Sequence, residues 1–291
     1  MAPRFSGEPS AASVSAVLTD YHVHLRPDEL DSTPADEFFT AANVERYLEA
    51  AGHAGIDELG VSEHIHRFAD CLEIWDHPFW QEQAHDDLAA YCEFVRGTPL
   101  RLGIEMDYLS GREDRIANVL DRHEFDYVVG SVHFVRNRAV DHDDYDVWDR
   151  RSDPDEVWKL YFQTLAEAIR TGLFDICAHP DLVKVWGAGR PAPRRDVRFH
   201  YEPAVEAIAE AGIAVEVSTA GWRKPAAEQY PSEAFAGMCI DAGAAFALSS
   251  DAHLPEHIGY EYERAVALMR NWGIGEIAVF EGRQRRMETL G

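Results

Sequence analysis

The chain has 291 residues, of which 46% are hydrophobic and 27% are charged, so it is long enough to bury a full core. Its 52 acidic and 27 basic residues give a formal net charge of −25. This charge repels phosphate backbones, argues against extended nucleic-acid binding and is typical of a solubilising surface.

The cysteines Cys71, Cys92, Cys177 and Cys239 lack paired spacing and predict isolated thiols rather than a disulfide framework. No apolar run is long enough for a membrane span, and the first 16 residues lack the apolar segment of a signal peptide. We therefore expect a cytoplasmic protein. Residues 1–14 are small and polar and predict a disordered leader, followed by a single domain over 15–291.

Short apolar runs alternate with amphipathic helical segments along the chain. The helix predicted over 153–172 begins after an Asp cap and ends at Gly172. A loop rich in tryptophan and acidic residues precedes the helix near 82–96. Other helices are predicted at 43–55 and 112–123, and strands at 14–24, 56–64, 100–109, 125–135, 174–180, 213–219 and 245–253; the run at 277–280 is compatible with a further short strand.

Repeated strand–helix units favour a parallel sheet with helical crossovers. Seven or eight such units in under 300 residues suit a closed (β/α) barrel better than an open, doubly wound sheet. The first strand is not followed by the GxGxxG pattern of dinucleotide-binding folds. The sequence thus predicts an α/β protein built as a barrel.

Residues that commonly bind metals recur where these predicted strands end. Asp20, His22 and His24 alternate along the first strand, so their side chains point to one face. The later strand ends carry Glu63 and His64, Glu105, His133, His179 and Asp181, and Asp251 with His253. Because the carboxyl ends of barrel strands meet at one mouth, we expect these side chains to gather there.

Any one of these histidines, taken alone, is more often a satisfied core residue than a ligand. Six of the 14 histidines at the same ends of five strands form a pattern that favours a metal site. Imidazole and carboxylate without thiolate suit zinc, iron or manganese. Clustered divalent ions are suited to displacement at phosphorus, and Glu105 is the best candidate for a shared ligand.

Six motifs occur in an order that resembles the polymerase and histidinol phosphatase (PHP) superfamily, and within it the histidinol-phosphatase branch. They are DYHVH (20–24), GVSEH (60–64), GIEMDY (103–108), VGSVHF (129–134), CAHPDLVK (177–184) and LSSDAH (248–253). The resemblance implies a distorted (β/α)7 barrel with two or three divalent ions, which would be zinc, iron or manganese.

The resemblance also implies how these ions would be held. The first ion would take His22, His24, Glu105 and Asp251; the second would take Glu105, His133 and His179; the third would involve His64 and His253. Some members carry a further histidine about six residues after the HxH pair. It is absent here, so we expect either a weak third site or Glu63 or a water in its place.

The segment EVSTAGWRKPAAEQYPS (216–232) resembles one that follows the sixth strand in histidinol phosphatases. Its Arg223 and Lys224 are candidates for binding phosphate, as is Lys184. For each of these basic residues the alternative is a charge on a solvated loop.

The resemblance therefore predicts a phosphomonoesterase that hydrolyses L-histidinol phosphate in histidine biosynthesis. Glu105, Asp251 and His253 are the predicted catalytic residues, with His253 or a water protonating the leaving oxygen. Acidic residues at the mouth, with Glu63, Asp107 and Asp181 as candidates, would attract the cationic amine of the substrate.

Two alternatives remain open at this point. The first is a PHP phosphoesterase that acts on nucleotides or nucleic-acid ends, because the net charge disfavours only long polymers. The second is a non-catalytic, metal-binding regulatory module, against which the nearly complete ligand set argues. The tryptophan-rich insertion near 75–80 could be a lid, a dimer surface or plain packing.

Overall fold

The computed structural model describes residues 16–28, 33, 35–149 and 151–291. Seven strands form one parallel sheet in the order β1-β2-β3-β4-β7-β8-β9. Their bounds are β1 (Thr19–Asp20), β2 (Glu58–Val61), β3 (Arg101–Asp107), β4 (Tyr127–Ser131), β7 (Ile176–Cys177), β8 (Ala214–Ser218) and β9 (Ala245–Ser249).

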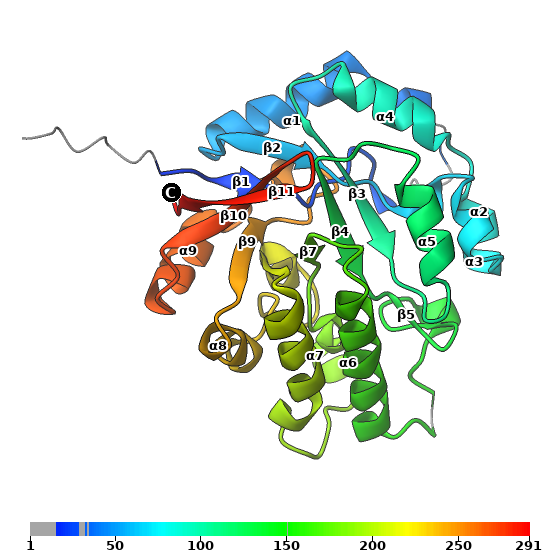
Figure 1. The fold of residues 1–291 in the computed structure, drawn as a ribbon, viewed down its shortest axis with the longest axis vertical. Helices are drawn as coiled ribbons and strands as arrows, with labels where there is room; N and C mark the ends of the chain where they lie inside the picture. The colour runs from blue at the N-terminus through cyan, green and yellow to red at the C-terminus, as the bar shows by residue number, and fades with distance from the viewer. Residues whose placement is uncertain (1–15, 29–32, 34, 150) are drawn as a thin grey trace, which may run out of the picture.

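The two edges of this sheet meet just beyond β1 and β9. Val23 forms a parallel bridge with Ala252, and the His24 N–H donates to the Ala252 carbonyl at 2.7 Å. This contact makes the sheet a nearly closed barrel (Figure 1), so the predicted distorted seven-stranded barrel is confirmed.

Helices surround the barrel on the outside (Figure 1). The longest one, α6 (Pro154–Arg170), begins after Asp153, whose carboxylate accepts from the Asp155 N–H, and the chain turns at Gly172 with φ 68°. Both signals were expected from the sequence. The other helices are α1 (Ala41–His53), α2 (Cys71–Ile74), α3 (Pro78–Gln83), α4 (Leu88–Arg96), α5 (Glu113–Leu120), α7 (Arg198–Ala211), α8 (Glu233–Asp241) and α9 (Tyr262–Asn271).

The single helix predicted near 82–96 is wrong in its first turn, because α3 and α4 are separate there. The N–H groups of His85 and Asp86 donate to the Arg67 carbonyl instead of continuing a helix. Asp87 then caps α4 by accepting from the Ala90 N–H. The break therefore results from pairing with a distant segment, which local sequence does not reveal.

The strand predicted over 125–135 is wrong in its last residues. It ends at Ser131, and β5 (Phe134–Val135) instead pairs antiparallel with β6 (Arg138–Ala139). The turn between them places Arg136 and Asn137 at positive φ of 47° and 64°. His133 therefore sits directly after the barrel strand and before this small hairpin.

The apolar run 277–280 is a strand, as the sequence indicated, but it does not join the barrel. It belongs to β10 (Glu276–Glu281), which pairs antiparallel with β11 (Gln284–Thr289). Ala278 and Phe280 pack in a buried cluster with Tyr21 and Tyr127. Arg283, at the hairpin turn, contacts the carbonyls of Asp126 and Leu173, just before β4 and β7, so the hairpin covers the amino end of the barrel.

The predicted leader over 1–14 lies outside the described residues, and the single domain over 15–291 stays a prediction. Within the described ranges, no helix combines the length and the apolar character needed to cross a membrane.

Candidate metal centre

Glu105, on β3, lies at the centre of the residues that the sequence singled out. Its Oε2 atom lies 2.5 Å from His64 Nδ1 and 3.3 Å from His22 Nε2. Its Oε1 atom lies 3.4 Å from His133 Nε2 and 3.3 Å from His179 Nε2. Four imidazoles, which follow β1, β2, β4 and β7, therefore converge on one buried carboxylate at the carboxyl mouth of the barrel.

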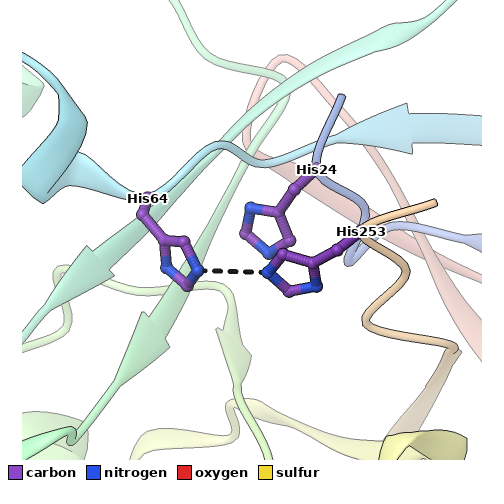
Figure 2. A group of neighbouring side chains, drawn as sticks. All are labelled: His24, His64 and His253. Carbon is purple, nitrogen blue, oxygen red and sulfur yellow. Dashed lines mark hydrogen bonds between the residues drawn. The ribbon is translucent and has the colours of Figure 1, made fainter. Parts of the chain in front are cut away.

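Asp251 and the remaining two histidines complete the cluster. Asp251 Oδ1 lies 3.7 Å from His22 Nε2, 3.6 Å from His24 Nε2 and 3.6 Å from His253 Nδ1. The His24 ring stacks on both His64 and His253, with centroids 4.2 Å apart in each case (Figure 2). All eight predicted metal ligands thus lie in one place.

The ligand atoms fall into three groups, each with all members within 4.8 Å of one another. One group contains His22, His24 and Glu105, and a second contains Glu105, His133 and His179. The third contains His24, His64 and His253. This division matches the sets implied by the family resemblance with two differences: Asp251 is in none of the three groups, and His24 also joins the third.

The electrostatics of the cluster keep its central carboxylate ionised. Burial raises the pKa of Glu105, but the imidazoles of His64 and His22 outweigh it and hold that pKa well below its usual value. Burial lowers the pKa of His22, but Glu216 and Glu105 outweigh it and raise that pKa well above its usual value. Burial, together with His253 and His64, holds the pKa of His24 well below normal, which keeps this imidazole neutral and able to bind a metal.

Several buried ring nitrogens fit a bound divalent cation. His22 Nε2 and both ring nitrogens of His24 are buried and have no hydrogen-bond partner among the described residues. Burying unpartnered polar atoms is costly, and so many in one cluster need a common explanation. Neutral imidazoles and carboxylates, without a thiolate, suit zinc, iron or manganese.

Two further carboxylates contact the Nδ1 atoms of two of these histidines and orient their rings. Glu216 Oε1 lies 2.8 Å from His22 Nδ1, while its Oε2 accepts from the backbone N–H of His179. Asp107 Oδ1 lies 2.8 Å from His133 Nδ1. A carboxylate on the second nitrogen fixes the tautomer of a metal-binding histidine and raises its basicity.

Sequence reasoning did not select Glu216, and it assigned Asp107 to the amine of the substrate instead. The sequence nevertheless contains a pattern that marks each of these two acids. Glu216 stands between two valines of a buried strand, and Asp107 lies two residues from Glu105 on the same face of β3. An acid inside an apolar strand is therefore a signal for a site carboxylate, as a histidine at a strand end is for a ligand.

A cavity of about 430 Å³ opens onto the cluster. Its lining includes four aromatic residues, the acidic side chains of Asp107 and Asp141 and the cation of Lys224. The aromatic residues are Phe79, Phe134, Trp186 and Tyr230. Trp75 and Trp80 of the tryptophan-rich insertion are buried against their neighbours, so these two side chains serve packing.

Lys184 and Arg223 have partners that the sequence did not suggest. Lys184 Nζ lies 3.0 Å from Asp181 and 2.8 Å from Glu228. The Arg223 guanidinium donates to the carbonyls of Ser250 and Asp251 at 2.9 and 2.8 Å. Of the three basic residues predicted to bind phosphate, only Lys224 lines the cavity in the described part of the chain.

The three acidic residues predicted to bind the amine of the substrate also differ in whether they reach the cavity. Asp107 reaches the cavity, but Glu63 and Asp181 are buried and do not line it in the described structure. Glu63 accepts from the Leu25 N–H and pairs with Arg67, and Asp181 accepts from the Ser232 N–H. These internal contacts engage both Glu63 oxygens and one oxygen of Asp181.

Asp20 does not reach the metal cluster, although it shares a strand face with His22. Its carboxylate accepts from the N–H and the hydroxyl of Ser250, at 2.9 and 2.5 Å. Burial raises its pKa to about 6 despite these hydrogen bonds. Its contacts tie β1 to the chain after β9, which is a structural role.

The fold agrees with the comparisons to known proteins. Residues 37–220 match the family model described as the PHP domain. A protein of Deinococcus radiodurans named "Probable histidinol-phosphatase" is 31% identical over 278 residues, which cover 93% of this chain and 98% of that protein. A Schizosaccharomyces pombe protein of the same name is 23% identical over 194 residues, 62% of each chain.

Among solved structures, the histidinol phosphate phosphatase of Lactococcus lactis, in complex with zinc, L-histidinol and phosphate, has a similar fold. The TM-score is 0.72 at 19% identity, over 94% of this chain and all of that one. The chain belongs to the PHP domain family.

Proposed function

We propose that this protein is a metal-dependent phosphatase that hydrolyses L-histidinol phosphate to L-histidinol and phosphate. The observation that carries the metal-dependent chemistry is the convergence of six histidines on Glu105 and Asp251 at the floor of a cavity. The choice of substrate is supported by the Deinococcus relative, which is similar over nearly its whole length and is named for this activity.

The ligand sets follow the three groups of side chains, with Asp251 added to the first because its carboxylate lies beside His22 and His24. His22, His24, Glu105 and Asp251 would hold a first ion, and Glu105, His133 and His179 a second. His64 and His253 would contribute to a third. Divalent ions in these sites supply Lewis-acid chemistry: they lower the pKa of water and neutralise negative charge on phosphate oxygens.

The residues of the chain hold this site in shape. Glu105 stays ionised and is shared between groups, while Glu216 and Asp107 orient His22 and His133. His253 Nδ1 faces the Asp251 carbonyl at 3.2 Å, and His253 Nε2 faces Asp28 at 2.8 Å. The role of His253 as proton donor stays a prediction from the sequence.

The cavity has complementary groups for each part of the substrate. Lys224 is the cavity-lining cation expected to bind phosphate oxygens. The aromatic residues of the lining provide apolar surface for the imidazole ring, and Asp107 and Asp141 provide negative charge for the ammonium group. The cytoplasmic location expected from the sequence remains a prediction.

A steady-state assay tests this proposal. The protein is stripped with a chelator, reloaded separately with zinc, iron or manganese, and assayed on histidinol phosphate and on a panel of nucleoside monophosphates. We expect metal-dependent phosphate release with histidinol phosphate as the preferred ester. Preference for a nucleotide would favour the nucleotide phosphoesterase, and no release from any ester by metal-loaded protein would favour a non-catalytic module.

A further inference from the structure

Tyr230 lines the cavity above the metal cluster and carries a buried hydroxyl without a partner. Its side chain is 1% exposed, and the hydroxyl oxygen has no hydrogen-bond partner among the described residues. In this segment the sequence selected only Arg223 and Lys224 as candidates for binding a ligand. Buried polar groups normally have a partner, so an orphaned hydroxyl beside a cavity points to a bound molecule that supplies one.

Tyr230 lies at the end of the cavity that holds the metal cluster. Its ring meets the His179 ring edge-on, with centroids 6.1 Å apart and an interplanar angle of 69°. Burial, together with the carboxylates of Asp181 and Asp251, raises the pKa of Tyr230 well above its usual value. The hydroxyl therefore keeps its proton and is a hydrogen-bond donor rather than a base.

The surrounding chain holds the Tyr230 ring in one position. Its backbone N–H donates to the Ser218 carbonyl at 3.0 Å, and its carbonyl accepts from the Ser218 N–H at 2.7 Å. A Cβ atom on Gly221 would lie 3.1 Å from Tyr230 Cε2, so glycine at this position lets the chain pack closely on the ring. Lys184 Nζ lies 5.2 Å from the ring centroid, where a cation is attracted by the electrons of the ring. These contacts position the hydroxyl without engaging it.

The phosphate of the ester is the part of the substrate that suits this hydroxyl. A tyrosine hydroxyl has a single proton to donate, and its strongest acceptors are negatively charged oxygens. The ammonium group of the substrate is itself a donor, and the carboxylates of Asp107 and Asp141 line the cavity to accept from it. Lys224, the cavity-lining cation, comes from the same segment as Tyr230.

We propose that the Tyr230 hydroxyl donates a hydrogen bond to a phosphate oxygen of the ester, which makes Tyr230 a catalytic residue of this site. The proposal rests on the proposed function for the identity of the ester, but not for the binding of phosphate. The hydroxyl keeps its proton throughout and stabilises negative charge on the phosphoryl group.

A pair of matched variants tests this assignment. Tyr230→Phe removes only the hydroxyl, and Tyr127→Phe makes the same change at another buried hydroxyl without a partner in the described ranges. Tyr127 is the first residue of β4 and therefore lies at the amino end of the barrel, where it packs with Tyr21. Calorimetry with metal-loaded protein measures the binding of inorganic phosphate and, separately, of L-histidinol. Steady-state kinetics and urea denaturation of the metal-free protein complete the comparison.

We expect Tyr230→Phe to bind inorganic phosphate about tenfold more weakly and to lose about tenfold or more in kcat/KM, because it lacks a hydrogen bond to a charged acceptor. Its affinity for L-histidinol should stay at the wild-type value. Its urea midpoint should be equal or higher, because no internal hydrogen bond is removed. Tyr127→Phe should keep the wild-type affinities and kcat/KM.

Three results would overturn the proposal. The first is a normal phosphate affinity in folded Tyr230→Phe. The second is weaker binding of L-histidinol instead of phosphate, which would place the hydroxyl at the amine. The third is a lower urea midpoint for Tyr230→Phe, which would show that the hydroxyl stabilises the fold. A wild-type protein that binds phosphate but does not hydrolyse histidinol phosphate would refute the proposed function, whereas weaker phosphate binding by its Tyr230→Phe variant would still support the role of Tyr230.

Discussion

The imidazole of His22 and the carboxylate of Glu216 meet across the barrel interior, with His22 Nδ1 2.8 Å from Glu216 Oε1. They come from β1 and β8, which are not neighbours in the sheet. The other oxygen of Glu216 accepts from the backbone of His179, so one carboxylate positions parts of two ligand groups.

Replacing Glu216 by glutamine should weaken metal binding without removing any ligand. The loss of its charge lowers the basicity of His22, and we expect affinity to fall about 10–100-fold. Competition with a chromogenic chelator measures this affinity. Glu276→Gln, on the exposed end of β10, is the matched control. Equal affinities for Glu216→Gln and the control would contradict this role.

We predict that Arg223 supports the backbone conformation of Asp251 rather than binding phosphate. Its guanidinium donates to the carbonyls of Ser250 and Asp251, and Asp251 has a left-handed backbone with φ 50°. This conformation is unfavourable for a residue other than glycine and needs support from its surroundings. We expect Arg223→Ala to lose about tenfold in kcat and in metal affinity, with little change in inhibition by inorganic phosphate. The opposite pattern, weak phosphate inhibition with normal metal affinity, would support the phosphate-binding role predicted from the sequence.

Lys224→Ala should raise both the KM for histidinol phosphate and the inhibition constant of inorganic phosphate. A charge-assisted hydrogen bond to phosphate contributes about 1.5–3 kcal/mol, so we expect roughly a tenfold change or more. Steady-state kinetics measure both constants. Lys159→Ala, on the exposed side of α6, should leave them unchanged. Normal constants for Lys224→Ala would show that this cation does not bind the phosphate.

Lys184→Ala should reduce stability rather than substrate binding. Lys184 is nearly buried and pairs with Asp181, which is 0% exposed, so its removal leaves a buried charge without its cation. Breaking such a pair costs about 3 kcal/mol in the free energy of unfolding. Urea denaturation measures this loss. An unchanged unfolding free energy with a raised KM would instead favour the phosphate-binding role.

Metal removal should destabilise the folded protein as well as inactivate it. Ions that bind only the native state add about 3 kcal/mol of stability when free metal is a hundredfold above its dissociation constant. We expect chelation to lower the thermal midpoint by roughly 5–10 °C. Differential scanning calorimetry with and without chelator gives this shift, and readdition of the metal should reverse it. An identical midpoint in both samples would argue against a structural contribution of the cluster.

The sequence by itself predicted the barrel and the eight side chains that the structure brings together around Glu105 and Asp251. Strand and helix periodicity, and histidines and acids at the strand ends, are local patterns, and the rule that parallel strands end at one mouth brings them together. The same local information could not reveal the break between α3 and α4, because it depends on contacts of His85 and Asp86 with Arg67.

Only the tertiary structure decided which charged groups face the cavity and which pair with other groups inside the protein. Lys184 and Lys224 look equivalent in the sequence, but in the described structure Lys184 is tied by ion pairs to the buried Asp181 and the partly exposed Glu228, whereas Lys224 lines the cavity. Glu216 gains its role from a partner 194 residues away in the chain, His22. The partners of a side chain depend on how distant strands are brought together, and no local pattern encodes that geometry.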